Sequence, residues 1–481
     1  MNSSLKQNIV AGIIWQSLER CGSQLIQFIV SIILARLLEP RDFGLIAIVL
    51  VFLTISDIFV DGGFRNSIIQ AKEITAQALS SIFWCNIAVA FLAYCILWAI
   101  APYIADVYHH EELKRILRFL GIIPIIHGIS VVNNSLLIKN MAFRKKLLIT
   151  LSALSISAPV GISMAFFGHG VWSLVTMRIA EATVTTIVTI TVVRWLPKFT
   201  FSLKSVSKLF SFGGKLLCIS MLDQFFLNFF QLFVGKFFDI SMLAFYNRGN
   251  SYAKLAMNTV NNSISPVMFP AFSRIQNDRA ELKNLLCKSI KILMVIVIPL
   301  LAMLALCAHP LVIILLTAKW ERCVFFLQMG CVEYSVWPLQ ILNIWCILSR
   351  GDSSSVLRME IAKKVLLTLA VLLSIRYDLK IMIIAWTSVT IVNFFLNSYP
   401  NARQLKYGGL HQLVDLMPTL LVTAASLVLA LPFCYVKCGP TLQLPLRIAV
   451  FGTVYVLLSM RFQRSTCDML IRNIKSKIHR I

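Results

Sequence analysis

Charged side chains are scarce in this 481-residue chain, where they make up 14% of the residues while 58% are hydrophobic. A soluble domain usually has about a quarter of its residues charged, because its surface must be hydrated. So few charges could not cover the apolar residues in water. The composition therefore excludes an ordinary soluble protein and favours one that is solvated by lipid.

Motifs for catalysis and for metal or nucleotide binding are also missing. The twelve cysteines are scattered mostly through apolar segments, and the seven histidines form no nucleophile or acid–histidine grouping. No glycine-rich phosphate-binding loop occurs. We therefore expect no catalytic residues, no metal and no cofactor. The same absences, together with short outer turns, disfavour the alternative of a membrane polysaccharide polymerase or ligase.

Long apolar segments dominate what is present. A bilayer core of about 30 Å takes about 20 apolar residues per helix, and uninterrupted runs indicate helices rather than barrel strands. We predict an all-α polytopic membrane protein with fourteen transmembrane helices. They are expected near residues 9–35, 43–64, 79–105, 116–138, 147–167, 171–195, 209–235, 242–268, 286–307, 323–348, 357–376, 380–399, 412–436 and 443–461.

Basic residues outnumber acidic ones by 45 to 21, which gives a net charge of +24. Such an excess can indicate nucleic-acid binding, but here the bases lie in short turns between apolar runs, where they act as topology signals. The turns on one side of the membrane hold most of them. The positive-inside rule then places both termini in the cytoplasm, and we expect no nucleic-acid partner.

A short internal repeat joins residues 35–45 to residues 235–245. Both copies contain a small residue, a base, two apolar residues and an acid, and six predicted helices separate them. An even number of intervening helices makes the repeat parallel, which predicts two six-helix lobes related by an axis along the membrane normal. The predicted domains are residues 1–200 and 201–405 as the two lobes, and 406–481 as two further helices with a basic tail.

Polar residues form stripes within the first, seventh and eighth predicted helices, and the second helix adds Thr54, Asp57 and Asp61. A charge at the bilayer centre costs about 2.5–3.5 kcal/mol, so such residues normally face water or a partner and mark a transport path. Steps of three and four residues place them on one helix face. The stripes contain Gln16, Arg20, Gln24 and Gln27; Gln224 and Asn228; and Asn247, Lys254, Asn258 and Asn262, with Arg248 on the flank.

These stripes predict a hydrated central cavity that holds an anionic, hydroxyl-rich ligand. Arginine binds phosphate oxygens well, and amides suit sugar hydroxyls. Structural interpretations stay open beside this one. Glu19 and Arg20 could neutralise each other, Arg178 and Glu181 could form a buried pair, and the amides could serve as hydrogen bonds between helices.

The chain resembles the Wzx-type oligosaccharide flippases of the polysaccharide transporter family in the MOP superfamily, close to those serving colanic acid and other exopolysaccharides. The residues that carry the resemblance are 26–38, 40–47, 61–64 and 245–248. It implies a MATE-like fold of two lobes, alternating access, and a location in the bacterial inner membrane. The implied cargo is an undecaprenyl-diphosphate-linked oligosaccharide, and the implied partners are membrane lipids and the polymerase and glycosyltransferases of the same pathway.

The resemblance also suggests roles for individual residues. Related flippases place basic residues on the first and eighth helices, which carries diphosphate binding to Arg20, Arg248 and Lys254. Transporters of this fold are usually driven by ion gradients, so Na⁺ or H⁺ is the expected coupling ion. The acids available for coupling are Asp57, Asp223, Glu181 and Glu333. An ion-coupled drug or metabolite antiporter of the same fold is the rival interpretation.

Overall fold

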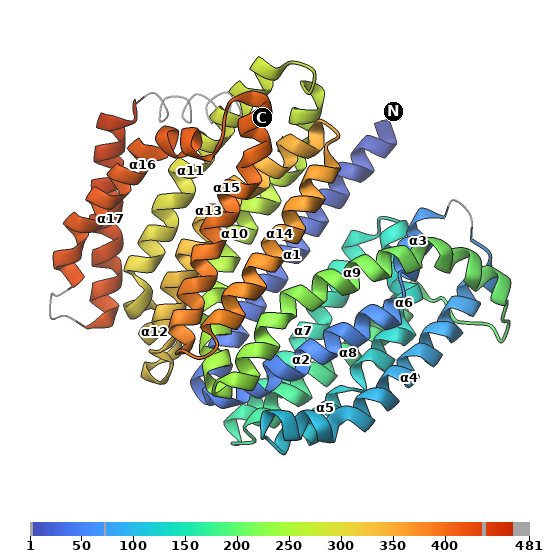
Figure 1. The fold of residues 1–481 in the computed structure, drawn as a ribbon. Coiled ribbons are helices and arrows are strands. Elements are labelled where there is room, and N and C mark those ends of the chain that lie inside the picture. Colours follow the sequence, from blue (N-terminus) through green and yellow to red (C-terminus); the bar gives the residue numbers. More distant parts are fainter. Residues whose placement is uncertain (1–2, 72–73, 435–438, 465–481) are drawn as a thin grey trace. The chain divides into compact units, whose positions relative to one another are not determined.

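The computed structural model describes residues 3–71, 74–434 and 439–464, and every regular element in these ranges is helical. In chain order the elements are α1 (Ser3–Leu37), α2 (Pro40–Asp61), α3 (Phe64–Gln70), α4 (Ala76–Tyr108), α5 (Glu112–Leu120), α6 (Ile123–Lys139), α7 (Phe143–Phe166), α8 (Val171–Val193), α9 (Leu203–Phe237), α10 (Ile240–Arg274), α11 (Arg279–Leu306), α12 (Ala308–Leu316), η1 (Ala318–Trp320), α13 (Cys323–Ser349), α14 (Ser353–Ser374), α15 (Leu379–Leu405), α16 (Gly409–Ala430), η2 (Leu431–Cys434) and α17 (Pro440–Phe462). Figure 1 shows their course.

Eleven candidate membrane spans, each long and apolar enough to cross a bilayer, lie in the described part of the chain. They confirm the prediction of an all-α, multi-pass membrane protein. Three further long helices, α9, α10 and α14, are not among the eleven. They coincide with the remaining expected spans, and the count of fourteen stays a prediction.

The contacts divide the chain into two compact units, residues 1–244 and 245–481. The boundary falls within the first turns of α10, so that α9 packs as part of unit 1 and α16 and α17 belong to unit 2. The predicted lobes at 1–200 and 201–405, with 406–481 as an addition, stay a prediction.

The helix bounds follow the repeat that was found in the sequence. The helices α1 and α9 each have 35 residues and begin at Ser3 and Leu203, and their successors begin at Pro40 and Ile240. An offset of 200 residues therefore relates both pairs of helix ends. The recurring part is the first helix with its turn, because α2 has 22 residues and α10 has 35.

Two glycines bring α2 close to α9 and to the first residue of α10 within unit 1. A Cβ atom on Gly44 of α2 would lie 2.2 Å from the carbonyl oxygen of Ile240, and one on Gly235 of α9 would lie 2.9 Å from Cδ1 of Ile48. At Gly44 the obstacle is backbone, so only glycine fits there, whereas at Gly235 the Ile48 side chain would have to shift. In membranes, where lipid is as apolar as the helices, close packing of this kind is a main source of association.

Two predicted helices end or break at glycine. The segment predicted as one helix at 116–138 is divided at Gly121–Ile122 into α5 and α6. The helix predicted to end at Phe64 ends at Asp61 instead, because Gly62 and Gly63 adopt positive φ angles of 53° and 70°. This left-handed conformation favours glycine and closes the helix.

In unit 2, buried amides join α13, α15 and α16. Asn343 and Gln412 exchange two hydrogen bonds of 2.9 Å, and Asn401 donates to Asn343 Oδ1 at 2.8 Å. All three side chains are fully buried. On the other side of α16, Tyr455 of α17 donates to the carbonyl oxygen of Val295 on α11. The last two helices are thereby fixed to the body of unit 2.

Candidate functional site

The polar stripe of α1 is open on the surface of unit 1. The side chains of Arg20, Gln24 and Gln27 are exposed, and that of Gln16 is half-buried. The guanidinium of Arg20 makes no ion pair or hydrogen bond with any residue in the described ranges. Three amides and a cation thus remain available on one face of this helix.

Glu19 is held away from that face. It is 8% exposed, and its carboxylate lies 3.7 Å from Nζ of Lys146 and accepts a hydrogen bond of 3.1 Å from Thr150, both on α7. The interpretation in which Glu19 neutralises Arg20 is therefore wrong. Adjacent residues point to different sides of a helix, so the Glu19 carboxylate faces α7 while the side chain of Arg20 does not.

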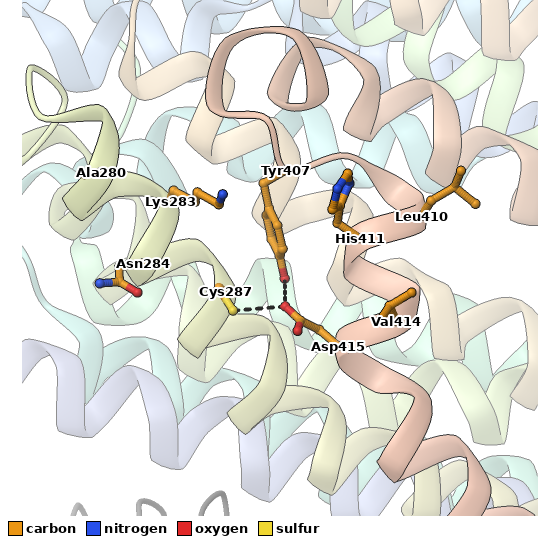
Figure 2. Close-up of a pocket in the computed structure, with 9 residues that line it drawn as sticks. All are labelled: Ala280, Lys283, Asn284, Cys287, Tyr407, Leu410, His411, Val414 and Asp415. Carbon is orange, nitrogen blue, oxygen red and sulfur yellow. Dashed lines mark hydrogen bonds between the residues drawn. The ribbon is translucent and has the colours of Figure 1, made fainter.

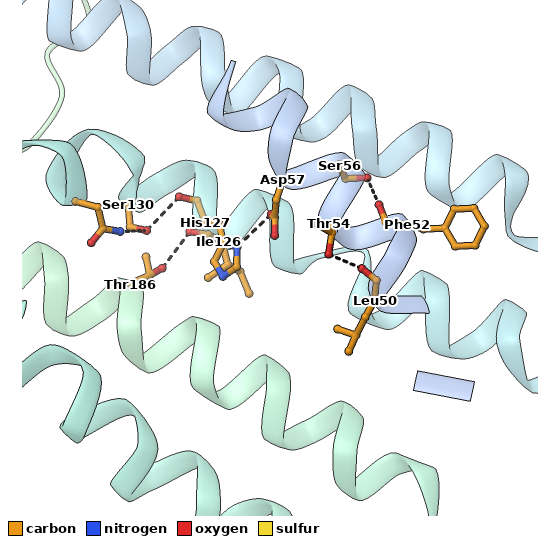
Figure 3. Close-up of polar contacts among 10 residues, drawn as sticks. Leu50, Phe52, Thr54, Ser56, Asp57, Ile126, His127, Ser130 and Thr186 are labelled. Atoms are coloured by element: carbon orange, nitrogen blue, oxygen red, sulfur yellow. Dashed lines mark hydrogen bonds and ion pairs between the residues drawn. The ribbon is translucent and has the colours of Figure 1, made fainter. Parts of the chain in front are cut away.

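A pair of titratable side chains lies inside unit 1. Nδ1 of His127 on α6 is 3.1 Å from Oδ1 of Asp57 on α2, as Figure 3 shows. The side chains are 41% and 37% exposed, so the pair is open to an ion from outside. Asp57, one of the four predicted coupling acids, therefore has a partner that can itself bind a proton.

The backbone around this pair is firmly held. Gly128 lets α6 approach, because a Cβ there would already touch Val60 of α2 and Ala90 of α4 at 3.4 Å. Ser130 donates to the carbonyl oxygen of His127, and Thr186 of α8 donates to that of Ile126 (Figure 3). The imidazole thus sits on a helix whose position is fixed from three sides.

One more acid lies one helical turn from Asp57. Asp61 is close enough for its charge to interact with that of Asp57, and Arg65 pairs with Asp61 at 3.5 Å. This pairing, at the two glycines that end α2, agrees with a structural role for Asp61 at the turn.

The other predicted residues of unit 1 bond within their own helices. Arg178 Nη1 lies 3.1 Å from Oε2 of Glu181 on α8, so the two residues pair, but their side chains are 42% and 26% exposed and the pair is not buried. On α9, Asn228 donates to the backbone oxygen of Gln224 at 2.8 Å and to its side chain at 3.3 Å. The side chain of Asp223 lies outside the described residues.

In unit 2, Arg248 on α10 is half-buried against an aromatic ring. Its Cζ lies 5.5 Å from the ring centre of Trp320, which is fully buried in η1. A cation over a tryptophan face is attracted by the ring quadrupole, which also fixes the direction of the guanidinium. Its neighbour Asn247 is half-buried as well.

Farther along α10, a second group forms around Glu333 of α13. Trp386 Nε1 donates to Oε1 of Glu333 at 3.2 Å, and Lys254 is close enough to interact with this carboxylate electrostatically. Lys254 is exposed and Asn258 is half-buried, while the side chain of Asn262 lies outside the described residues. Lys254, a predicted diphosphate-binding base, therefore lies near Glu333, a predicted coupling acid.

Sequence reasoning missed His127, Lys146 and Trp386. A signal for the first was present, because His127, Ser130 and Asn134 follow each other at steps of three and four residues within an apolar segment. No such signal marked the other two, whose partners are distant in the sequence. Within the described ranges, no group of three or more His, Cys, Asp or Glu side chains could hold a metal ion.

Helices with polar and basic faces are features that polytopic membrane transport proteins share. The chain belongs to the polysaccharide biosynthesis protein family, whose model matches residues 33–325. The relatives and solved structures that it resembles include a succinoglycan biosynthesis transport protein and a lipid II flippase.

Three relatives show the range of the similarity. The succinoglycan biosynthesis transport protein ExoT of Rhizobium meliloti (strain 1021) is 27% identical over 64% of this chain, which spans 62% of the length of ExoT. The lipopolysaccharide biosynthesis protein WzxC of Escherichia coli (strain K12) is 26% identical over 68% of this chain and 67% of its own. The teichuronic acid biosynthesis protein TuaB of Bacillus subtilis (strain 168) is 22% identical over 98% of this chain and 99% of its own.

Two solved structures share the fold. The lipid II flippase MurJ in an inward closed conformation matches with a TM-score of 0.74 at 13% identity, over 94% of this chain and 99% of its own. An inward-facing multidrug resistance MATE transporter of the MOP superfamily matches with a TM-score of 0.55 at 14% identity, over 82% of this chain and 99% of its own. At these identities the similarity establishes the MATE-like and MurJ-like fold.

Proposed function

We propose that this protein flips undecaprenyl-diphosphate-linked oligosaccharide repeat units from the cytoplasmic to the periplasmic leaflet for the synthesis of a surface polysaccharide. The observation that carries the proposal is the recurrence of bases and amides along α1 and α10, two helices that coincide with predicted membrane spans. Arg20 stands among exposed amides in unit 1, and Arg248 and Lys254 follow Asn247 along α10. Charged groups inside a membrane are costly and mark a substrate path.

The chemistry of the cargo fits these groups. A diphosphate accepts charge-assisted hydrogen bonds from guanidinium groups, and sugar hydroxyls exchange hydrogen bonds with amides. Arg20, Arg248 and Lys254 would bind the diphosphate, and the amides Gln16, Gln24, Gln27, Gln224, Asn228, Asn247, Asn258 and Asn262 would contact the glycan. Alternating access of two lobes, 1–200 and 201–405, would carry the cargo across, with both chain termini in the cytoplasm.

An ion gradient would drive the cycle. Of the four predicted acids, Asp57 has the partner best suited to proton exchange, since His127 can take up a proton at the same point. Glu181 already has an arginine partner, and Glu333 has Trp386 and Lys254 beside it. The polymerase and glycosyltransferases of the same pathway would be the functional partners.

The test is the double variant Arg20→Ala/Arg248→Ala in cells whose chromosomal copy is deleted. We expect surface polymer to be lost and lipid-linked repeat units to accumulate on the cytoplasmic leaflet, while the amount of protein in the membrane stays unchanged. The matched control is Arg115→Ala, an exposed arginine on α5 outside the polar stripes. Full export by the double variant would overturn the assignment, and altered drug sensitivity with normal export would favour a drug antiporter.

A further inference from the structure

A pocket of about 570 Å³ opens in unit 2 between the beginnings of α11 and α16 (Figure 2). Both helices are candidate membrane spans that start at this level. The ends of spans lie where lipid headgroups meet the hydrocarbon core. The pocket is therefore expected at the headgroup level, on the side that the charge distribution predicts to be cytoplasmic.

The wall of the pocket contains one acid whose charge is already balanced. Oδ1 of Asp415 lies 2.9 Å from Nζ of Lys291, while Oδ2 accepts hydrogen bonds from the Tyr407 hydroxyl at 2.8 Å and the Cys287 thiol at 3.1 Å. Burial raises the pKa of Tyr407, so its hydroxyl keeps the proton that it donates. With Lys291 as counter-charge, this carboxylate does little to repel an anion.

Two basic side chains of the pocket are open to a ligand. Lys283 reaches toward Tyr407 from α11, and His411 stands on α16 on the other side of that ring (Figure 2). Both are exposed, and neither makes a hydrogen bond or ion pair within the described part of the chain. An ammonium and an imidazole can both donate to phosphate oxygens.

An apolar stripe leads away from the pocket along α16. Leu410 and Val414 line the pocket and are 71% and 69% exposed, and Met417 and Leu421 continue the series at 46% and 61%. Steps of four, three and four residues place these side chains on one face of the helix. The stripe begins at the basic groups and runs into the span, as the headgroup and chain of a phospholipid would.

We propose that this pocket binds the phosphate of an anionic phospholipid through Lys283 and His411, with an acyl chain along the stripe of α16. Basic pockets between membrane helices on the cytoplasmic side are suited to such headgroups. A ligand that binds the folded protein also stabilises it by mass action. The bound lipid would hold α16 on α11, next to the cluster around Asp415.

The experiment uses full-length protein purified in detergent, titrated with dioleoyl phosphatidylglycerol or, in parallel, dioleoyl phosphatidylcholine. Bound lipid is counted by native mass spectrometry, and the thermal midpoint is followed by tryptophan fluorescence. We expect phosphatidylglycerol to bind and to raise the midpoint more than phosphatidylcholine. Removing each base should weaken that binding roughly fivefold, so the variant Lys283→Gln/His411→Gln should lose most of the preference. Lys288→Gln, an exposed lysine of α11 outside the pocket, is the matched control.

Three outcomes would overturn the proposal. One is equal affinity for phosphatidylglycerol in the wild type and the double variant. Another is an equal rise of the thermal midpoint with inorganic phosphate alone, which would indicate a site for free anions. The third is displacement of the bound lipid by undecaprenyl diphosphate, which would indicate a cargo site. If the double variant is misfolded, Leu410→Ser/Val414→Ser supplies the test, since it should abolish the preference for dioleoyl over short-chain phosphatidylglycerol. Polymer export by these variants is measured separately, because the lipid site does not depend on the flippase proposal.

Discussion

Nδ1 of His127 lies 3.1 Å from Oδ1 of Asp57, although the two residues are 70 positions apart and belong to different helices. The histidine makes this contact an ion pair only when it is protonated. Gain of a proton therefore strengthens the attraction between α6 and α2, and its loss weakens that attraction. A proton can in this way act directly on the packing of two membrane helices, which is what coupling of an ion to a conformational change requires.

His127→Ala is expected to slow export of polymer roughly tenfold, a change of about 1.4 kcal/mol in the barrier. The physical reason is that Asp57 loses its partner on α6, so a proton on the imidazole can no longer strengthen the contact between the two helices. Transport of lipid-linked oligosaccharide into inverted vesicles, measured over a series of imposed pH gradients, should also lose its dependence on the gradient. Asp57→Asn should have the same effect, and the double variant should be no slower than either single one, because both remove one interaction.

His169→Ala, an exposed histidine in the turn between α7 and α8, serves as the control and should transport normally. Wild-type rates with an unchanged response to the gradient in His127→Ala would exclude this pair as the coupling site.

Asn343→Leu is expected to lower the free energy of unfolding of unit 2 by about 1–3 kcal/mol, since it leaves the buried Oε1 of Gln412 without its donor and removes the side-chain acceptor that Gln412 and Asn401 share. The thermal midpoint of purified protein should fall accordingly. Asn343→Leu/Gln412→Leu should lose less than the two single effects combined, because removing both partners leaves fewer unsatisfied groups. Strict additivity would show that the amides do not interact.

Gly44→Ala is expected to destabilise unit 1 by about 1–3 kcal/mol, the usual cost of overpacking. The new Cβ would meet the backbone of Ile240, which cannot rotate away as a side chain can. Gly22→Ala on α1 is the matched control, because nothing lies within 4 Å of the added atom there. That change should leave the thermal midpoint unchanged or raise it, since alanine favours helix over glycine by up to about 1 kcal/mol. Equal midpoints for the two variants would contradict the close packing at Gly44.

Local patterns in the sequence were sufficient for the helices and the repeat. Long apolar runs and the matched turns after Arg36 and Lys236 both reflect interactions within one segment, so they are visible without a fold. The polar stripe of α1 was predicted for the same reason. Whether Glu19 neutralises Arg20 had to stay open, because the partners of Glu19, Lys146 and Thr150, are brought to it by the packing of α7. Pairs between distant helices depend on tertiary contacts, and no periodicity within one helix can indicate them.

A last prediction concerns pH and the beginning of α14, outside the membrane spans. Asp352 caps this helix, accepting a hydrogen bond of 3.1 Å from the backbone N–H of Ser355. Hydrogen bonds from Ser355 hold the pKa of Asp352 below its usual value of 3.8. A carboxyl with a lowered pKa in the folded state stabilises the protein above its unfolded pKa, and this contribution is lost as the pH falls through the folded value. Asp352→Ala should therefore cost about 1 kcal/mol near pH 7, and the difference between wild type and variant should shrink as the pH falls below 3.8. The thermal midpoints of both proteins, measured between pH 3 and pH 7, give this difference in stability.

Asp378→Ala is the matched control. Asp378 occupies the same position before α15 but makes no side-chain capping bond, so its removal should show no such pH-dependent difference.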